Sequence, residues 1–185
     1  MKNLIICAHF DDEVLGCSSI LKNSDVLVIC GNDIRKEIAD KISNELGINY
    51  YTFDYEPHSL QFEFQNVLCD RINEIAKNYE NIYTHNANDY HKDHQIVSNC
   101  VDVITRKNRS DYKSLIHFFI ETDFKYNYIK EVDYNFKVEM IDKYKDYVSQ
   151  YLKDLHISKM EHLSVENYTV NMCEQFKIVY MKDFI

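Results

Sequence analysis

The chain has 185 residues, of which 45% are hydrophobic and 28% are charged, and its formal net charge is −9 at pH 7. This length and composition are typical of a globular protein, so we expect a single α/β domain over residues 1–185 with a continuous core. The negative charge is spread along the chain without a basic block, which argues against nucleic acid and anionic membranes as partners.

The first apolar run, residues 3–8, predicts a buried strand. A polar cluster follows it at His9, too soon for the apolar region of a signal peptide or for a membrane span, so we expect a cytoplasmic protein without membrane insertion. The six cysteines form no CxxC pair, which favours buried free thiols over a thiolate zinc site.

Helix and strand patterns alternate along the rest of the chain. After the strand at 3–8 we expect a helix at 12–22, a strand at 25–30, a helix at 34–46 that Gly47 ends, a strand at 49–53, a helix at 60–78, a strand at 81–85, a helix at 93–107 and a strand at 113–120. Beyond Glu121 the pattern predicts no definite element. Apolar strands that alternate with helices favour a three-layer α/β/α sandwich with a mainly parallel, Rossmann-like sheet and right-handed crossovers.

Two polar clusters follow strands of this expected sheet. "HFDDE", residues 9–13, comes after the first strand, and "HNANDYHKDH", residues 85–94, begins as the strand at 81–85 ends. Ligands of such folds gather at the carboxyl ends of the strands, so we expect both clusters at one edge of the sheet. Taken alone, each cluster also fits an ordinary structural role, as an acid-capped helix start or a polar surface loop.

The residue types in the two clusters suit a metal ion. His9 and Asp12 are three residues apart, so both can turn toward one point, and His94 could complete a set of two imidazoles and one carboxylate. Three protein ligands leave an open position on zinc, as in catalytic sites, where bound water has a pKa near 7. Spacing alone does not decide which of Asp11 and Asp12 binds the metal and which accepts the proton of the water.

Other polar residues near the clusters have separate expected roles. His91 could stabilise an oxyanion or protonate a leaving amine, with Asp93 as the partner that holds its ring. Glu13 suits the helix dipole better than catalysis. His58 lies outside both clusters, which favours a surface or core role.

The two clusters resemble the signatures of the PIG-L/LmbE-type zinc-dependent N-deacetylases, which remove acetyl groups from amino sugars. "AHFDDEVLGCSSIL" is similar to their first signature, Ala-His-Pro-Asp-Asp-Glu followed by Leu-Gly and small residues, with Phe10 in place of the proline. "DYHKDH" matches the second, an Asp and then His-x-Asp-His before a helix. "ELG" before a strand and "CEQF" near the carboxyl end are also similar, so the resemblance covers most of the chain.

The resemblance implies an α/β sandwich and a role for each residue of the site. In the numbering of this sequence these are the zinc ligands His9, Asp12 and His94, the general base Asp11 and the assisting histidine His91.

The resemblance also concerns the substrate and the partners. It implies that Arg35 and Asp54 contact the sugar, and that the partner is a small-molecule amino sugar. Fe²⁺ or Co²⁺ could replace Zn²⁺ at such a nitrogen and oxygen site. Related proteins often assemble, and the tyrosine-rich part after Glu121 is a candidate surface for a homo-oligomer.

We therefore expect a zinc-dependent hydrolase that removes an N-acetyl group from an amino sugar or a sugar conjugate, such as a nucleotide-linked one. One alternative is a metal-dependent phosphoesterase that acts on a nucleotide, which would need a second metal about 3.5–4 Å away and more basic residues. The other is a catalytically silent sugar-binding homologue, which an assay for bound zinc would separate from the enzyme.

Overall fold

The computed structural model describes residues 2–107, 111–120, 126–166 and 173–181. Within these residues one seven-stranded sheet has the order β3-β2-β1-β4-β5-β7-β6. Its first five strands pair in parallel, whereas β7 is antiparallel to both of its neighbours. The strands are β1 (Asn3–Cys7), β2 (Ser24–Val28), β3 (Tyr50–Thr52), β4 (Asn81–His85), β5 (Ser114–Phe118), β6 (Tyr128–Glu131) and β7 (Cys173–Met181).

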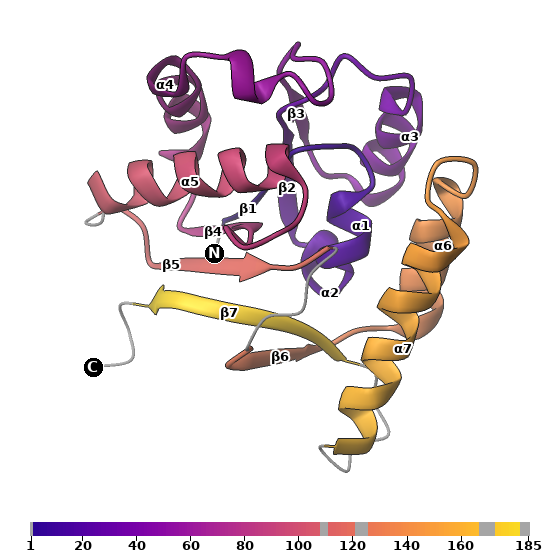
Figure 1. Ribbon diagram of the computed structural model, residues 1–185. Helices are drawn as coiled ribbons and strands as arrows, with labels where there is room; N and C mark the ends of the chain where they lie inside the picture. The colour runs from indigo at the N-terminus through magenta and orange to yellow at the C-terminus, as the bar shows by residue number, and fades with distance from the viewer. Residues whose placement is uncertain (1, 108–110, 121–125, 167–172, 182–185) are drawn as a thin grey trace.

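Helices cover both faces of the sheet, as Figure 1 shows. The helices α4 and α5 lie on one face with the short 3₁₀ helix η1, and the other helices lie on the opposite face. The three-layer α/β/α sandwich expected from the sequence is therefore confirmed. The helices are α1 (Asp12–Gly16), α2 (Ser18–Leu21), α3 (Lys36–Leu46), η1 (Leu60–Phe62), α4 (Gln65–Ala76), α5 (Lys92–Lys107), α6 (Tyr134–Lys143) and α7 (Gln150–Glu166).

The strand β1 shows why the apolar runs are continuous. Leu4 and Ile6 belong to the core cluster under α4 and α5, and Ile5 and Cys7 belong to the cluster on the opposite face. All four side chains are fully buried. Successive residues of a strand point to opposite faces, so a strand that is covered on both faces is apolar at every position.

The expected helix at 12–22 is two short helices, α1 and α2, which meet at Cys17. The backbone N–H groups of Ser18 and Ser19 donate to the carboxylate of Glu174 on β7, at 3.1 and 2.9 Å, instead of continuing the first helix. Gly16, at the end of α1, packs closely on β5, since a Cβ atom there would lie 2.5 Å from Cδ2 of Phe118. The "LG" of the first signature therefore permits this close approach.

The other expected elements lie near the predicted positions. The helix expected at 60–78 is divided into η1 and α4, and α3 ends as predicted at Gly47, whose φ of 66° is in the left-handed region. The elements β6, α6, α7 and β7 lie in the part after Glu121, for which no definite element was expected.

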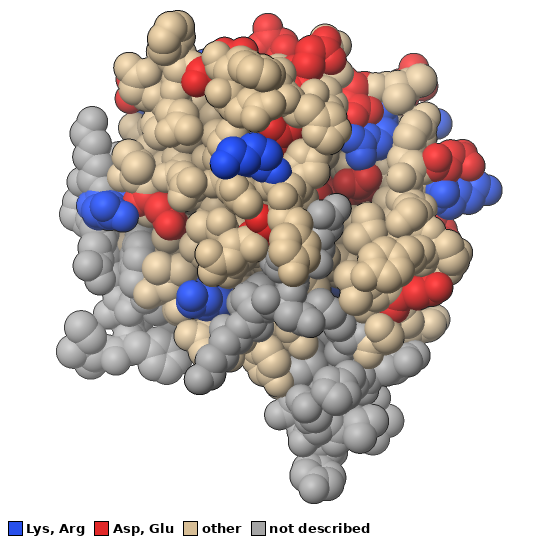
Figure 2. Space-filling view, viewed as in Figure 1, with Lys and Arg blue, Asp and Glu red and all other residues tan. Residues whose placement is uncertain are grey.

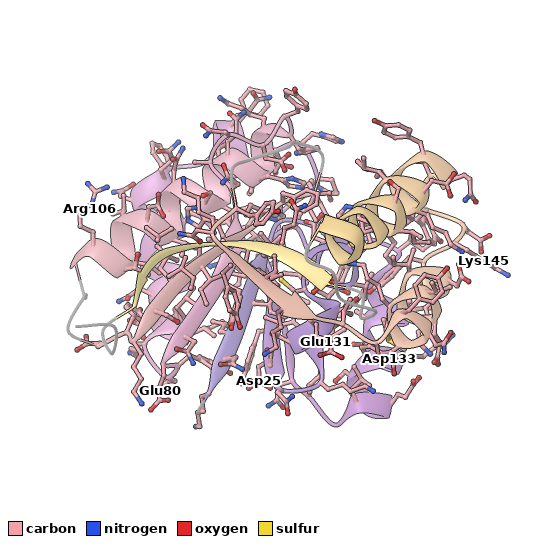
Figure 3. All side chains as sticks on the ribbon, turned by 90° about the horizontal axis from the view of Figure 1, so that it is seen from below. Asp25, Glu80, Arg106, Glu131, Asp133 and Lys145 are labelled. Atoms are coloured by element: carbon pink, nitrogen blue, oxygen red, sulfur yellow. The ribbon has the colours of Figure 1, made fainter. Side chains whose placement is uncertain are left out.

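The amino ends of the strands carry acidic residues with structural partners. Figure 3 shows Asp25 and Glu80 at the same end of the sheet. Asp25 accepts a hydrogen bond of 2.6 Å from the hydroxyl of Tyr79, and Glu80 pairs with Lys113 at 3.2 Å. These acids are therefore used in holding neighbouring elements together.

Two further expectations concern the whole chain. Cys7, Cys17, Cys30, Cys69 and Cys100 are buried free thiols, and the side chain of Cys173 lies outside the described residues. None of the described helices combines the length and the apolar character that crossing a membrane requires.

Candidate metal site

The two polar clusters meet where the order of the strands reverses. β1 and β4 are paired neighbours in the sheet, although β2 and β3 lie between them in the chain. The chain first extends the sheet from β1 toward β3, then returns and extends it from β4 toward β5. Such a reversal opens a crevice at the carboxyl ends of the two central strands. Residues 9–13 follow β1 and residues 86–94 follow β4, so both clusters lie at this crevice.

His9, Asp12 and His94 converge there, and all three are buried. Nδ1 of His9 lies 3.3 Å from Nε2 of His94 and 3.7 Å from Oδ2 of Asp12. Nε2 of His94 lies 3.4 Å from Oδ1 of Asp12. Ligand atoms about 2.0–2.1 Å from a tetrahedral zinc ion are about 3.3 Å from one another. His9 and His94 approach different oxygens of Asp12, Oδ2 and Oδ1, so the three residues lie together and their types suit a zinc ion. The combinations His9–His91–His94 and Asp12–His85–His94 also bring three possible ligand atoms within 4.8 Å of one another.

Each of the two histidines has a buried carboxylate at its other ring nitrogen. Oδ2 of Asp93 lies 3.0 Å from Nε2 of His9, and Oδ1 of Asp89 lies 3.0 Å from Nδ1 of His94. A carboxylate holds the proton on the nitrogen that it faces, which leaves the nitrogen directed at Asp12 for a cation. Against the effect of burial, Asp12 and then Asp89 raise the pKa of His94 to about 10, so in the metal-free protein this nitrogen of His94 carries a proton that a bound metal would displace. The rings are thus prepared to bind a cation. The sequence alone did not suggest this role for Asp89.

His85 also lies near Asp12, with its Nε2 3.3 Å from Oδ2. However, Nε2 of His85 accepts a hydrogen bond of 2.9 Å from the backbone N–H of Ala8, so its lone pair is already used. The His85 ring stacks on the ring of His94 at a centroid distance of 3.9 Å. Burial, and then the neighbouring His94, lower the pKa of His85 to about 4. His85 therefore supports His94 as a neutral packing partner.

His91 is oriented differently from the expectation. Its Nδ1 accepts a hydrogen bond of 3.1 Å from the backbone N–H of Asp93, in the first turn of α5, as an N-cap side chain does. The carboxylate of Asp93 lies 3.0 Å from Nε2 of His9. Burial, and then His9 and His94, lower the pKa of His91 to about 4. His91 is therefore neutral at pH 7, and its proton is on Nε2, where it can be donated in a hydrogen bond.

Asp11 lies beside these ligands in a strained backbone conformation, with φ of 95°. Its Oδ2 accepts a hydrogen bond of 2.6 Å from Nη1 of Arg35, whose Nη2 donates to Asp33 at 2.6 Å. Burial, and then the carboxylate of Asp12, raise the pKa of Asp11 well above its usual range, although Arg35 opposes this shift. A carboxylate with a raised pKa is better suited to accept a proton.

Glu13 and Phe10 support the loop that carries Asp11. Oε2 of Glu13 accepts the backbone N–H of Asp11 at 3.0 Å, and Oε1 accepts the hydroxyls of Tyr50 and Tyr144 at 3.2 and 3.0 Å. Phe10 is fully buried in the core cluster on the α1 face. Glu13 is thus a buried hydrogen-bonding centre and not only a partner of the helix dipole.

A cavity of about 220 Å³ opens over the candidate ligands. Figure 2 shows acidic and basic side chains together in a recess between the body of the molecule and the helices at its right. Most of the residues expected at the site line the cavity, namely His9, Asp11, Asp12, Arg35, His91 and His94. Asp93 lies behind His9, and the structure does not bring Asp54 into this cavity. The Asp54 side chain is 90% exposed, pairs with Arg71 at 3.3 Å and lines a neighbouring cavity.

His58, Tyr147 and Leu152 also line the cavity, although the sequence did not indicate it. His58 has a left-handed φ of 66°, and its backbone N–H donates to Oδ2 of Asp93 at 2.7 Å. It follows Pro57, the one proline of the chain, in the loop after β3. This loop starts at the carboxyl edge of the sheet, where ligands bind in such folds, and that position could have indicated His58 as a residue of the site. Tyr147 and Leu152 belong to the segment in which no element was expected.

No protein-family model matches the chain, and no curated protein matches its sequence. Solved structures are similar along almost its whole length. N,N'-diacetylchitobiose deacetylase from Pyrococcus horikoshii, in complex with its inhibitor MPG, has a TM-score of 0.74 at 15% identity, over 99% of this chain and 87% of that chain. The zinc-inhibited form of teicoplanin deacetylase Orf2 has a TM-score of 0.71 at 13% identity, over 100% of both chains.

The hydratase GalB from Pseudomonas putida, which acts on 4-carboxy-2-hydroxymuconate, is similar as well. Its TM-score is 0.79 at 12% identity, over 100% of this chain and 99% of that chain. At such identities the likeness shows a shared fold. Because deacetylases and a hydratase share that fold, the reaction has to be inferred from the residues of the site.

Proposed function

We propose that the protein is a metal-dependent hydrolase that removes the N-acetyl group of an amino sugar or a sugar conjugate. The observation that carries the proposal is the pair of buried Asp–His contacts, Asp93 with His9 and Asp89 with His94. Both direct a ring nitrogen toward Asp12, which is the way in which proteins orient metal-binding histidines. The names of the two structurally similar deacetylases agree with this reading.

In this proposal His9, Asp12 and His94 hold the metal. A bound zinc ion lowers the pKa of water and polarises a carbonyl group. Asp11 lies at the same cavity and accepts the proton of the water whose oxygen bonds to the amide carbon. His91 donates its Nε2 proton in a hydrogen bond to the carbonyl oxygen as negative charge develops there. When the C–N bond breaks, Asp11 returns the proton to the nitrogen, and acetate and a free amine result.

Phosphoester cleavage agrees less well with the same cavity. Among the described residues that line it, Arg35 is the one lysine or arginine, and it is paired with Asp11 and Asp33. A phosphate at the reacting centre would therefore lack a free basic partner.

The test measures amine release from a panel of N-acetylated sugars and nucleotide sugars, with and without a chelator. We expect amine release that a chelator abolishes and added Zn²⁺ restores. His94→Ala should lose both bound zinc and amine release. Full activity of this variant would refute the mechanism.

Asp11→Asn should keep bound zinc but lose turnover by about 10²–10⁴-fold, because the general base is removed. Asp102→Asn is a matched control, since Asp102 pairs with His117 at 3.1 Å outside the cavity. Loss of zinc from Asp11→Asn would instead reverse the roles proposed for Asp11 and Asp12.

A further inference from the structure

A second and larger cavity borders the metal cavity at the carboxyl ends of β2 and β3. Its volume is about 900 Å³, and Asp33, Lys36, Asp54 and Arg71 contribute to its lining. Residues 33–36 form a ridge between the two cavities, since Asp33 and Lys36 line the larger one and Arg35 lines the metal cavity. A substrate whose amide lies in the metal cavity could therefore extend over this ridge.

The two acidic and two basic residues of the larger cavity differ in how they are paired. The Asp33 carboxylate is already paired with Arg35, which donates to it from Nε at 3.0 Å and from Nη2 at 2.6 Å. The Asp54 carboxylate pairs with Arg71. Within the part of the chain that the structure describes, Lys36 is exposed and has no ion-pair partner. Lys36 and Arg71 are thus the two basic groups of this cavity, and neither is neutralised by a buried carboxylate.

Arg71 is held in a position that suits an anion. Its guanidinium carbon lies 4.3 Å from the ring centroid of Phe53 and 5.0 Å from that of Tyr55, so the aromatic rings support the group. Its contact with Asp54 is at 3.3 Å, and the Asp54 side chain is 90% exposed. Such a solvent-exposed ion pair is weak, and a guanidinium has five N–H donors. An entering anion can therefore bind Arg71 alongside Asp54 or in its place.

We propose that the larger cavity binds an anionic group, a phosphate or a carboxylate, which the substrate carries away from its amide. Lys36 and Arg71 are the residues that bind this group. The connection to catalysis rests on the proposed deacetylation, whereas the binding of an anion does not. Because the anion would lie away from the reacting atoms, its contacts are the same in the bound substrate and in the transition state, so they lower KM and not the chemical barrier.

The first test compares kcat/KM for N-acetylglucosamine, its 1-phosphate, its 6-phosphate and an N-acetylglucosaminide with a carboxylate on its aglycone. We expect the wild type to prefer an anionic member, and the preferred member identifies the anion and its position. In Lys36→Gln and Arg71→Gln the ratio of kcat/KM for that member to kcat/KM for N-acetylglucosamine should fall about tenfold, through KM. Lys113→Gln, which removes the same charge just before the amino end of β5, should keep the wild-type ratio.

The second test uses no catalysis. Glucosamine 1-phosphate and glucosamine 6-phosphate are titrated calorimetrically into the metal-free protein. Binding should weaken about tenfold in Lys36→Gln and in Arg71→Gln but not in Lys113→Gln. Binding that depends on Lys36 and Arg71 without any amine release would overturn the proposed function and support the anion site. A different result would overturn the anion site alone. In that case amine is released, the ratio of the two kcat/KM values is the same in all variants, and phosphosugar binding is unchanged in Lys36→Gln and Arg71→Gln.

Discussion

Asp89 and Asp93 do not face the point at which the candidate ligands converge, yet they decide what His9 and His94 can bind. Each carboxylate lies 3.0 Å from the ring nitrogen that is directed away from Asp12. Without such a partner, either ring could carry its proton on the nitrogen needed for the metal. The site therefore depends on these two Asp–His contacts as much as on its ligands.

The first prediction at this scale concerns Asp93→Asn. The neutral amide should orient the His9 ring less strictly, and zinc affinity should fall about 10–100-fold. Competition with a chromophoric chelator measures this affinity. Asp102→Asn is the control, because it changes a similar Asp–His pair outside the cavity. Equal zinc affinity in Asp93→Asn and the wild type would show that Asp93 has no part in orienting His9.

The second prediction concerns Glu13, whose pKa burial raises to about 7. Its pKa in the unfolded chain is about 4.3. Between about pH 4.3 and 7 the Glu13 carboxyl group is therefore protonated in the folded metal-free protein but ionised in the unfolded chain. The contribution of this proton binding to the stability of the folded protein is full below about pH 4.3 and is lost as the pH rises through 7. Glu13→Gln cannot titrate. The difference in unfolding free energy between wild type and Glu13→Gln should therefore fall by about 1 kcal/mol per pH unit between pH 5 and 7.

Urea unfolding of both metal-free proteins at pH 5, 6, 7 and 8.5 measures this difference. It should become constant above pH 8, where the carboxyl group is ionised in both states. A difference that stays the same from pH 5 to 7 would contradict a raised pKa of Glu13 in the folded protein.

Part of the site could be predicted from the residue types and their spacing. A histidine and two acids after one strand, and His94 after another, indicate metal chemistry, and the structure brings them to one crevice. The roles of Asp89 and Asp93 could not be predicted, because they depend on which ring nitrogen each carboxylate reaches. His58 was not recognised, since its backbone contact with Asp93 joins two loops far apart in the sequence.

At the scale of elements, β7 is tied to the helices that follow the first polar cluster. Glu174 on β7 accepts the backbone N–H groups at the start of α2 and pairs with Lys137 of α6 at 2.5 Å. The Lys137 and Glu174 side chains are 1% and 4% exposed. This contact joins three elements that local sequence patterns treat separately. The "CEQF" segment and the first signature are therefore in direct contact in the structure, through Glu174 and the start of α2.

Glu174→Gln should destabilise the protein by about 3–5 kcal/mol, because it leaves the buried ammonium of Lys137 without a counter-charge. Urea unfolding measures the loss. Lys137→Met combined with Glu174→Gln should recover part of the stability, since no buried charge then remains unpaired. The control Glu139→Gln removes a carboxylate that is 60% exposed and should cost less than about 1 kcal/mol. If Glu174→Gln were as stable as Glu139→Gln, the buried pair would not hold these elements together.

The predicted elements were those with strong local periodicity. The parallel strands β1, β2, β4 and β5 are apolar runs, and α3 and α5 repeat their apolar residues with a helical period. In contrast, β6 is a four-residue strand with little buried surface, and β7 finds both of its partners elsewhere in the chain. Local patterns contain little information about such pairing, because it depends on contacts between distant segments.

At the scale of the whole molecule, the layer architecture follows from the alternation of strands and helices, and the position of the site follows from the ends of the strands. The strand order β3-β2-β1-β4-β5 places the first polar cluster beside the second. The sequence predicted the common edge but not the reversal between β1 and β4, because the alternation of elements does not specify the order of strands in a sheet.

The position of β7 has a consequence for how the chain reaches its final state. Although β7 is the last described strand, it lies inside the sheet, between β5 and β6. During synthesis the hydrogen-bonding edge of β5 therefore remains unpaired until residues 173–181 have left the ribosome. An open strand edge invites pairing with other chains, and a strand inserted late requires a long loop to close. Incomplete chains should accordingly be prone to aggregate and to depend on chaperones.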